Sequence, residues 1–116
     1  MKELWNKIFK SKEMREYTKM YKRHRKTMIK LAKADRDFDY DFLHDLVVTK
    51  IKHMYEYYSA GHNVWQSDET LRQVLETLGH AIDVADKIDN SSIHVESKLY
   101  EEFYSYIGRN IRWWWD

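Results

Sequence analysis

Apolar and aromatic residues recur every three or four positions along four stretches of this chain of 116 residues. Such spacing places one side chain per turn on a common face and is typical of amphipathic α-helices. We therefore expect helices over about residues 2–33, 39–58, 68–89 and 95–114. Their apolar faces are Tyr17, Tyr21, His24, Met28 and Leu31; Leu43, Leu46, Val47, Ile51, Met54 and Tyr58; Leu71, Val74, Leu75, Leu78, Ile82, Ala85 and Ile88; and Leu99, Phe103, Ile107, Ile111 and Trp114.

Residues suited to helix ends separate these four stretches. The aspartates of "KADRDFDYDF" are unfavourable inside a helix but favourable at an N-cap or in a first turn. Gly61 predicts the end of the second helix, and Ser67 predicts the N-cap of the third. "DNSS" at residues 89–92 is expected to turn the chain before the last helix.

The composition agrees with an all-α fold, since the chain has no proline and only three glycines. We expect a single domain over 1–116: a compact bundle of about four helices, with 1–33 as a long basic N-terminal helix and 37–116 as the core. Gly79 and Gly108 lie inside expected helices, where glycine costs about 1 kcal/mol relative to alanine. Close packing of a second helix is the expected reason, and contact with a ligand is the alternative.

The charges are distributed unevenly, although the net charge is only +1. Residues 1–33 hold twelve Lys or Arg and three Glu, a balance of +9, whereas residues 34–116 hold eight basic and sixteen acidic residues, a balance of −8. One interpretation is that the basic first third packs beside an acidic body, in the same chain or in a neighbouring one. The other is an arm that binds anions.

The absence of cysteine excludes disulfides, thiol nucleophiles and thiolate metal ligands. No apolar run approaches the roughly 18 residues of a membrane span, and the N-terminus lacks the apolar core of a signal peptide. We therefore expect a soluble cytoplasmic protein that does not act on a membrane.

Six histidines raise the question of a metal centre, but no spacing requires one. Asp41 precedes His44 by one helical turn, and Glu76 and Asp83 lie one turn either side of His80. A di-iron bundle needs two Glu-x-x-His pairs and two more glutamates, and this set is missing. The sequence also lacks a phosphate-binding glycine loop, G-x-S-x-G and H-E-x-x-H. We expect neither a metal, a cofactor nor catalytic residues; a zinc site is left open on His44, His53, His62 or His80.

Aromatic and cationic residues occur together on two expected helices, and this mixture points to binding rather than catalysis. On the second helix a lysine, a histidine and a tyrosine follow one another at helical spacing, and the last helix has a similar mixture near its end. Stacking of a base on an aromatic ring, beside Arg or Lys, holds nucleotides without a dedicated loop. The alternative is that these aromatic residues belong to the core or to a subunit interface. The predicted ligand-binding residues are Lys50, His53, Tyr57, Trp65, Arg109, Arg112 and Trp113.

Three consecutive tryptophans close the chain, followed by an aspartate. Trp114 continues the apolar face of the last helix, whereas Trp113 and Trp115 cannot share that face. One indole is therefore expected to close the core, and another to cover a neighbouring helix, a subunit or a ligand.

The stretch "DFDYDFLHDLVVTKIKHMYEYY" resembles a segment of a widespread group of small tailed-bacteriophage proteins of mostly unassigned function. That group commonly shows an Asp–aromatic–Asp–Tyr opening, a Leu-rich helix, a Lys and a Met one turn apart, and a final Trp-Trp-Asp. The resemblance covers about residues 37–89 and 105–116, leaves the basic first helix outside, and implies a phage origin and an all-helical fold. The matching residues are Asp39, Tyr40, Phe42, Leu43, Leu46, Lys50, Met54, Trp114, Trp115 and Asp116.

Together, the resemblance and the mixed aromatic and cationic residues predict a phage-encoded anti-defence protein that sequesters a small nucleotide immune signal without turnover. It would act as a homo-oligomer in the host cytoplasm, with the cations on phosphates and an aromatic side chain on the base. The alternative is a protein–protein inhibitor or adaptor that uses its basic first helix on an acidic host or phage partner. A metal-dependent hydrolase of nucleotides is a third hypothesis.

Overall fold

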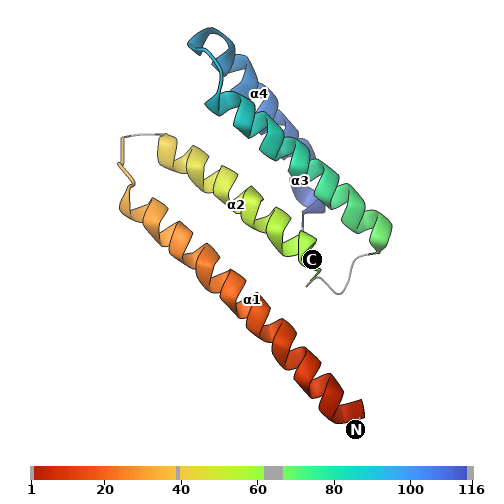
Figure 1. Cartoon of the computed structure of the whole chain (residues 1–116). Coiled ribbons are helices and arrows are strands. Elements are labelled where there is room, and N and C mark those ends of the chain that lie inside the picture. The colour runs from red at the N-terminus through yellow and green to blue at the C-terminus, as the bar shows by residue number, and fades with distance from the viewer. Residues whose placement is uncertain (1, 39, 62–66, 115–116) are drawn as a thin grey trace. The chain divides into compact units, whose positions relative to one another are not determined.

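The computed structural model describes residues 2–38, 40–61 and 67–114, with the backbone alone at residues 2–11, 93 and 94. Over this part of the chain the protein is all-helical (Figure 1). Its elements are α1 (Lys2–Lys33), α2 (Asp41–Ser59), α3 (Asp68–Asp89), α4 (Ile93–Asn110) and the short 3-10 helix η1 (Ile111–Trp113). The all-α class and the long basic first helix are confirmed, and α3 has the predicted bounds. The last helix was predicted to continue to residue 114, but its α-helical part ends at Asn110.

The chain divides into two compact units, residues 1–46 and residues 47–116. The boundary lies inside α2, so residues 41–46 belong with α1 rather than with the rest of α2. The sequence prediction instead placed the start of the core bundle at residue 37. The prediction of a single domain over the whole chain stays a prediction.

The first unit consists of α1 and the beginning of α2. Lys30 and Lys33 occupy the last turn of α1, where positive charge is favourable to the helix dipole. The helix then closes with a backbone hydrogen bond of 3.1 Å from the N–H of Ala34 to the carbonyl of Leu31. A cavity of about 310 Å³ lies beside this end of α1, and Phe42 of α2 is among its lining residues.

The second unit has a core centred on α3, which lies against α4 as its closest helical neighbour (Figure 1). Phe103 of α4 is completely buried against the core face of α3, and Ile51 and Tyr58 of α2 join the same cluster. Burying a large apolar side chain contributes about 1.5–3 kcal/mol, so this cluster is the main source of stability of the unit. The predicted apolar face of the third helix is thereby confirmed. The buried residues of α3 are Val74, Leu78, Ala81, Val84, Ala85 and Ile88.

On the predicted apolar faces of the second and last helices, two residues are exposed. Leu43 is 62% exposed, and His44 is buried in the same turn of α2. A period of 3.6 residues brings position 44 closer than position 43 to the face that carries Ile51 and Tyr58. At 3.6 residues per turn, Ile111 lies about 80° around the helix axis from Phe103, and it is 57% exposed.

The helix ends follow the predicted capping chemistry. The hydroxyl of Ser67 accepts a hydrogen bond of 3.3 Å from the backbone N–H of Thr70, as an N-cap serine does. Beyond the end of α2, Gly61 has a φ of +76°, a left-handed conformation that glycine adopts without steric cost. Both sequence signals are confirmed.

The two helical glycines differ in their surroundings. A Cβ at Gly79 of α3 would lie 3.6 Å from the ring of Tyr55 on α2, so a neighbouring helix does pack there. At Gly108 of α4 no described atom lies within 4 Å of the same position. The prediction of close packing is correct for Gly79 and wrong for Gly108, which faces open space.

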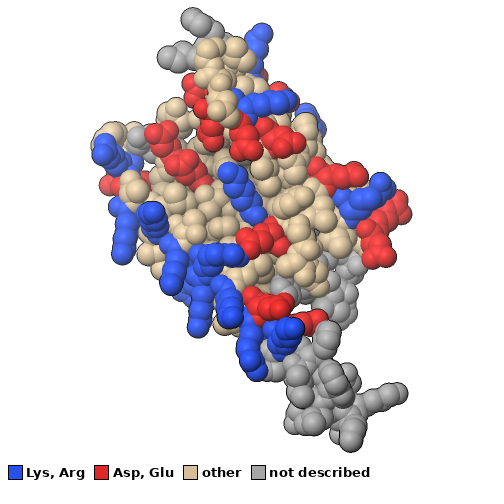
Figure 2. All heavy atoms as spheres, viewed as in Figure 1, with Lys and Arg blue, Asp and Glu red and all other residues tan. Residues whose placement is uncertain are grey.

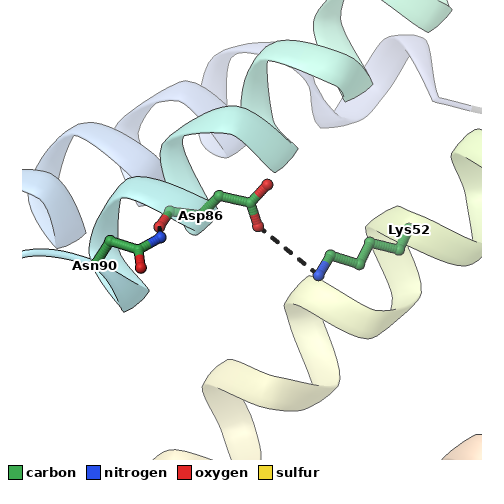
Figure 3. Close-up of polar contacts among 3 residues, drawn as sticks. All are labelled: Lys52, Asp86 and Asn90. Carbon is green, nitrogen blue, oxygen red and sulfur yellow. Dashed lines mark hydrogen bonds and ion pairs between the residues drawn. The ribbon is translucent and has the colours of Figure 1, made fainter.

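One ion pair joins α2 and α3 inside the second unit (Figure 3). The Nζ of Lys52 lies 3.9 Å from a carboxylate oxygen of Asp86, and both side chains are about half exposed. The amide of Asn90 donates a hydrogen bond of 2.8 Å to the backbone carbonyl of the same aspartate. Because exposed pairs contribute only about 0.2–1 kcal/mol, this contact orients the two helices more than it stabilises them.

Candidate functional site

The described part of α1 carries a row of cations along one side. Seven of them follow one another at steps of three or four residues, so they stack on one face of the helix. At 1.5 Å per residue the row is about 32 Å long. We call it the cationic face: Lys12, Arg15, Lys19, Lys22, Lys26, Lys30 and Lys33.

Every side chain of the cationic face is exposed. Figure 2 shows the blue Lys and Arg side chains gathered over α1. None of its six lysines forms an ion pair or hydrogen bond with any side chain that the structure describes. Between Lys12 and Lys33 the helix has nine basic and two acidic residues, a balance of +7. This is a concentrated, solvent-facing positive charge.

Aromatic and sulfur-containing residues occupy the other side of α1. The rings of Tyr17 and Tyr21 are stacked, with centroids 6.3 Å apart, and Met20 is buried. Arg25, which lies off the cationic face, has its guanidinium 5.8 Å from the centroid of the Tyr21 ring. The helix therefore has a cationic face on one side and an aromatic face on the other.

A second candidate site lies where α3 meets the end of α4, and two adjacent tryptophans define it. Trp114 is 6% exposed, and its indole N–H donates a hydrogen bond of 2.8 Å to the hydroxyl of Thr77 on α3. Trp113 is 66% exposed. The prediction that Trp114 closes the core is confirmed, whereas Trp115 lies outside the described residues.

Trp113 forms one wall of a cavity of about 220 Å³, which we call the Trp113 pocket. Besides apolar surface, the remaining wall carries hydroxyl and amide groups and one carboxylate. Such a combination of an aromatic face with a few polar groups is typical of small-molecule sites. The lining residues are Thr70, Gln73, Val74, Glu76, Thr77, Asn110 and Trp113.

An open cleft of about 580 Å³ runs along another side of α3. Leucines, Gly79 and Tyr55 give it apolar surface, and acidic side chains give it a negative character. It has no cluster of lysines or arginines that would hold a phosphate group. Its lining residues are Tyr55, Asp68, Leu71, Arg72, Leu75, Glu76, Gly79, His80 and Asp83.

Tyr106 of α4 lies beside this cleft, with its ring 4.4 Å from the ring of His80. Burial raises the pKa of the Tyr106 phenol, the nearby Arg109 opposes that rise, and Glu76 adds to it. The guanidinium of Arg109 lies 5.9 Å from the centroid of the same ring. At neutral pH the phenol is therefore protonated and is not poised to act as a base.

The predicted ligand-binding residues on α2 have different environments. Lys50 is exposed, whereas His53 and Tyr57 are half-buried. Tyr57 packs against the core of the second unit and meets the ring of Tyr58 edge-on, with centroids 5.3 Å apart. For Tyr57 the structure therefore shows the core environment that the sequence left open as an alternative.

At the end of α4, Arg109, Arg112 and Trp113 are all exposed. Of the predicted ligand-binding residues that the structure describes, Trp113 alone lines one of the two cavities. It forms a wall of the Trp113 pocket, and none of the others lines that pocket or the cleft along α3. Neither cavity is lined by predicted residues from both helices. Trp65, the remaining predicted residue, lies outside the described residues.

Sequence reasoning missed the polar side chains that α3 contributes to the Trp113 pocket. Thr70, Gln73 and Thr77 follow one another at steps of three and four residues, directly beside the apolar stripe. A polar row at helical spacing was the signal that could have identified them. The polar row becomes part of a pocket because the fold brings Asn110 of α4 next to it.

Within residues 2–38, 40–61 and 67–114, no group of three or more His, Cys, Asp or Glu side chains is arranged to hold a metal ion. His62, one of the open zinc candidates, lies outside these ranges. In the same part of the chain, no helix has the length and apolar character needed to cross a membrane.

The chain matches no protein-family model, no curated protein and no solved structure. The function must therefore be inferred from the chemistry of the cationic face and the Trp113 pocket. The resemblance to small phage proteins stays a prediction.

Proposed function

We propose that the protein is a non-enzymatic binding protein that holds an acidic protein partner on the cationic face of α1. The supporting observation is the exposed row of seven cations at helical spacing. Like charges one turn apart, such as Lys22, Lys26 and Lys30, destabilise an isolated helix by about 0.2–0.5 kcal/mol per pair. An acidic partner would turn that unfavourable charge repulsion into favourable attraction.

An acidic helix suits this face better than a nucleic acid does. The major groove of DNA, about 12 Å wide, surrounds a bound helix with phosphates on both flanks. The cationic face is a single straight row, and Arg25 is the one described cation of α1 well away from it. No Asn or Gln between residues 12 and 33 is available to read base edges. Glu or Asp residues repeated every three or four positions on a partner helix would match the row turn by turn.

Together with the resemblance to phage proteins, this surface supports an inhibitor or adaptor that acts on a host or phage protein. Steering by opposite charges speeds association and makes it sensitive to salt. Binding of this kind requires no catalytic residue and no cofactor.

The test compares three probes at equal charge: a helical peptide with Glu at every third or fourth position, a DNA duplex and vesicles containing phosphatidylserine. We expect the peptide to bind most tightly, with an affinity that falls as salt rises. Reversing two charges of the face, in Lys22→Glu/Lys26→Glu, should weaken peptide binding about tenfold or more, since exposed pairs contribute about 0.2–1 kcal/mol each and reversal adds repulsion.

The matched control reverses two exposed lysines of the second unit, in Lys87→Glu/Lys98→Glu. It changes the net charge equally and should leave peptide affinity within about twofold, since both lysines belong to the second unit and neither is part of the cationic face of α1. Equal weakening in both double variants would show a non-specific charge effect. Tighter binding to DNA or to vesicles would contradict an acidic protein partner.

Nucleotide sequestration is the second candidate, and the exposed indole of Trp113 favours it. An aromatic side chain exposed beside amide and hydroxyl groups can stack a base, and Arg109 and Arg112 are available for phosphates. A thermal-shift screen with cyclic dinucleotides and cyclic oligonucleotides tests it, since a ligand that binds the native state raises the melting temperature. Recovery of the ligand intact after heat denaturation is expected. A chemically changed product would contradict sequestration without turnover.

A further inference from the structure

We infer that the Trp113 pocket is a nucleobase site selective for guanine, an inference that rests on the second candidate function. The pocket combines a base-sized cavity, one exposed indole and a polar edge that is richer in acceptors than in donors. None of the described residues that line it is a lysine or an arginine, so the pocket recognises the base and not the phosphate.

The backbone that carries Trp113 is held in place although its indole is exposed. Trp114, the next residue, is fixed to α3 by the hydrogen bond between its indole and Thr77, and its backbone N–H bonds the carbonyl of Ile111 at 3.2 Å. These two contacts fix η1, which carries Trp113. The indole N–H of Trp113 has no hydrogen bond to the residues that the structure describes. A preorganised, uncovered ring is the element that base stacking needs.

The size of the cavity limits the ligand. At about 220 Å³ it is smaller than the roughly 300–1,000 Å³ of typical drug-sized sites. A single base fits this space, and the sugar and any phosphate must remain outside. A purine fills it better than a pyrimidine because it offers a larger stacking surface to Trp113.

The hydrogen-bonding groups of the pocket determine which purine base it binds more tightly. The hydroxyl of Thr77 is already committed, since it accepts from Trp114 and donates to the backbone of α3. The amide nitrogen of Asn110 donates to the carbonyl of Tyr106 at 2.9 Å, which leaves its oxygen as an acceptor.

Glu76 adds carboxylate oxygens, one of which lies 3.6 Å from a guanidinium nitrogen of Arg72. Guanine presents two neighbouring donors on one edge, the ring N1–H and the 2-amino group, and these match a carboxylate. Adenine presents an amino group alone on the corresponding edge. The amide of Gln73, which can both donate and accept, is available for the guanine oxygen.

Calorimetric titration of the full chain with guanosine, adenosine and guanosine monophosphate tests this assignment. We expect saturable binding of one guanosine per chain, weaker binding of adenosine, and about equal affinity for guanosine and its monophosphate. Trp113→Ala should weaken guanosine binding at least about fivefold, because base stacking on an aromatic ring is worth about 1–3 kcal/mol. Glu76→Gln should reduce the preference for guanosine over adenosine about tenfold.

Glu69→Gln is the matched control, since Glu69 is an exposed glutamate of the same helix that does not line the pocket. It should preserve both affinity and preference. Circular dichroism and melting temperature establish that each variant is folded. Equal affinities for guanosine and adenosine, or an unchanged preference in Glu76→Gln, would overturn the guanine assignment.

Two further outcomes separate this inference from nucleotide sequestration itself. If a cyclic nucleotide binds Trp113→Ala as tightly as the unchanged protein, but fails to bind Arg109→Ala/Arg112→Ala, the pocket assignment is wrong and sequestration survives. If neither nucleosides nor cyclic nucleotides bind, both are wrong.

Discussion

α1 and α3 are both long helices, yet they are stabilised in opposite ways. α3 buries six residues, and its exposed side chains carry mixed charges. Among its described side chains α1 buries Met20 alone, and it concentrates nine basic residues over 22 positions. Tertiary packing supplies most helical stability in proteins, so α3 has the stability of its core whereas α1 depends far more on local helix propensity.

The contrast separates structural from binding roles along the chain. Most of the core face of α3 is covered by α2 and α4, and the Trp113 pocket forms at its edge, where Val74 of the core lies beside polar side chains. α1 keeps its described lysine and arginine side chains exposed.

The largest effect is expected from removing the centre of the core. Phe103→Ala deletes a side chain with 0% exposure and should lower the free energy of unfolding of the second unit by about 3–5 kcal/mol. Trp113→Ala removes an even larger ring in the same unit, but one that is 66% exposed, and should change it by less than about 0.5 kcal/mol. Urea denaturation measures both. Similar losses would mean that Trp113 is a core residue and not part of an open pocket.

A threonine on each helix gives the second test. Thr27 of α1 and Thr77 of α3 both bond the carbonyl four residues earlier, at 3.1 Å and 2.9 Å. Thr77 alone also accepts the indole N–H of the buried Trp114. Thr77→Val leaves that donor unsatisfied and should cost about 1–3 kcal/mol, whereas Thr27→Val should stay within about 0.5 kcal/mol. If the two variants melt at the same temperature, the Trp114–Thr77 bond does not hold the end of α4.

The sequence predicted the helices well because periodicity and caps are local signals. The stripe of α3 and its cap at Ser67 required no knowledge of neighbours. Leu43 and Ile111 were predicted to lie in the core because both are apolar, but their angular positions around the helix axis place them off the buried face. The buried face of α2 passes through His44 instead of Leu43, and both Leu43 and Ile111 are exposed.

The candidate sites were harder to predict because they depend on which surfaces remain uncovered. The excess of positive charge in the first helix was evident, but its exposure was not. Tyr57 was predicted to stack on a ligand, but in the structure it packs against the core. Trp113 was identified, whereas its partners Gln73 and Glu76 lie some 40 residues away and become neighbours only in the folded chain.

Two serine caps provide the third test, at a smaller scale. Ser67 bonds the N–H of Thr70, whereas Ser92, the cap of α4, makes no side-chain hydrogen bond to its helix. Ser67→Ala should cost about 1 kcal/mol, and Ser92→Ala a few tenths at most, on the order of 0.3 kcal/mol. Denaturation midpoints at unchanged slope report the difference. Equal costs would show that the hydrogen bond of Ser67 does not stabilise α3 and that the helix is stabilised by the core alone.

The smallest effect concerns a tyrosine in each unit that has an arginine over its ring. Arg25 lies 5.8 Å from the ring of Tyr21 on α1, and Arg109 lies 5.9 Å from the ring of Tyr106 on α4. Tyr106 differs because it is half-buried against His80 of α3, and this burial raises the pKa of its phenol above the ordinary 10.0.

Because the pKa of Tyr106 is higher in the folded than in the unfolded chain, its ionisation makes the protein less stable at alkaline pH. Above pH 10 the unfolded chain releases the Tyr106 proton while the folded chain still holds it, so stability falls as pH rises from the ordinary pKa through the raised pKa of the folded state. Tyr106→Phe should remove this part of the alkaline loss. Arg109→Gln should raise the pKa of Tyr106 further, because Arg109 lowers it, and should thereby enlarge the loss. Absorbance at alkaline pH, taken as the difference between the unchanged protein and Tyr106→Phe, isolates the one phenol. A difference that titrates at or below pH 10 would show that the contact between α3 and α4 leaves this ring as accessible to water as an exposed side chain.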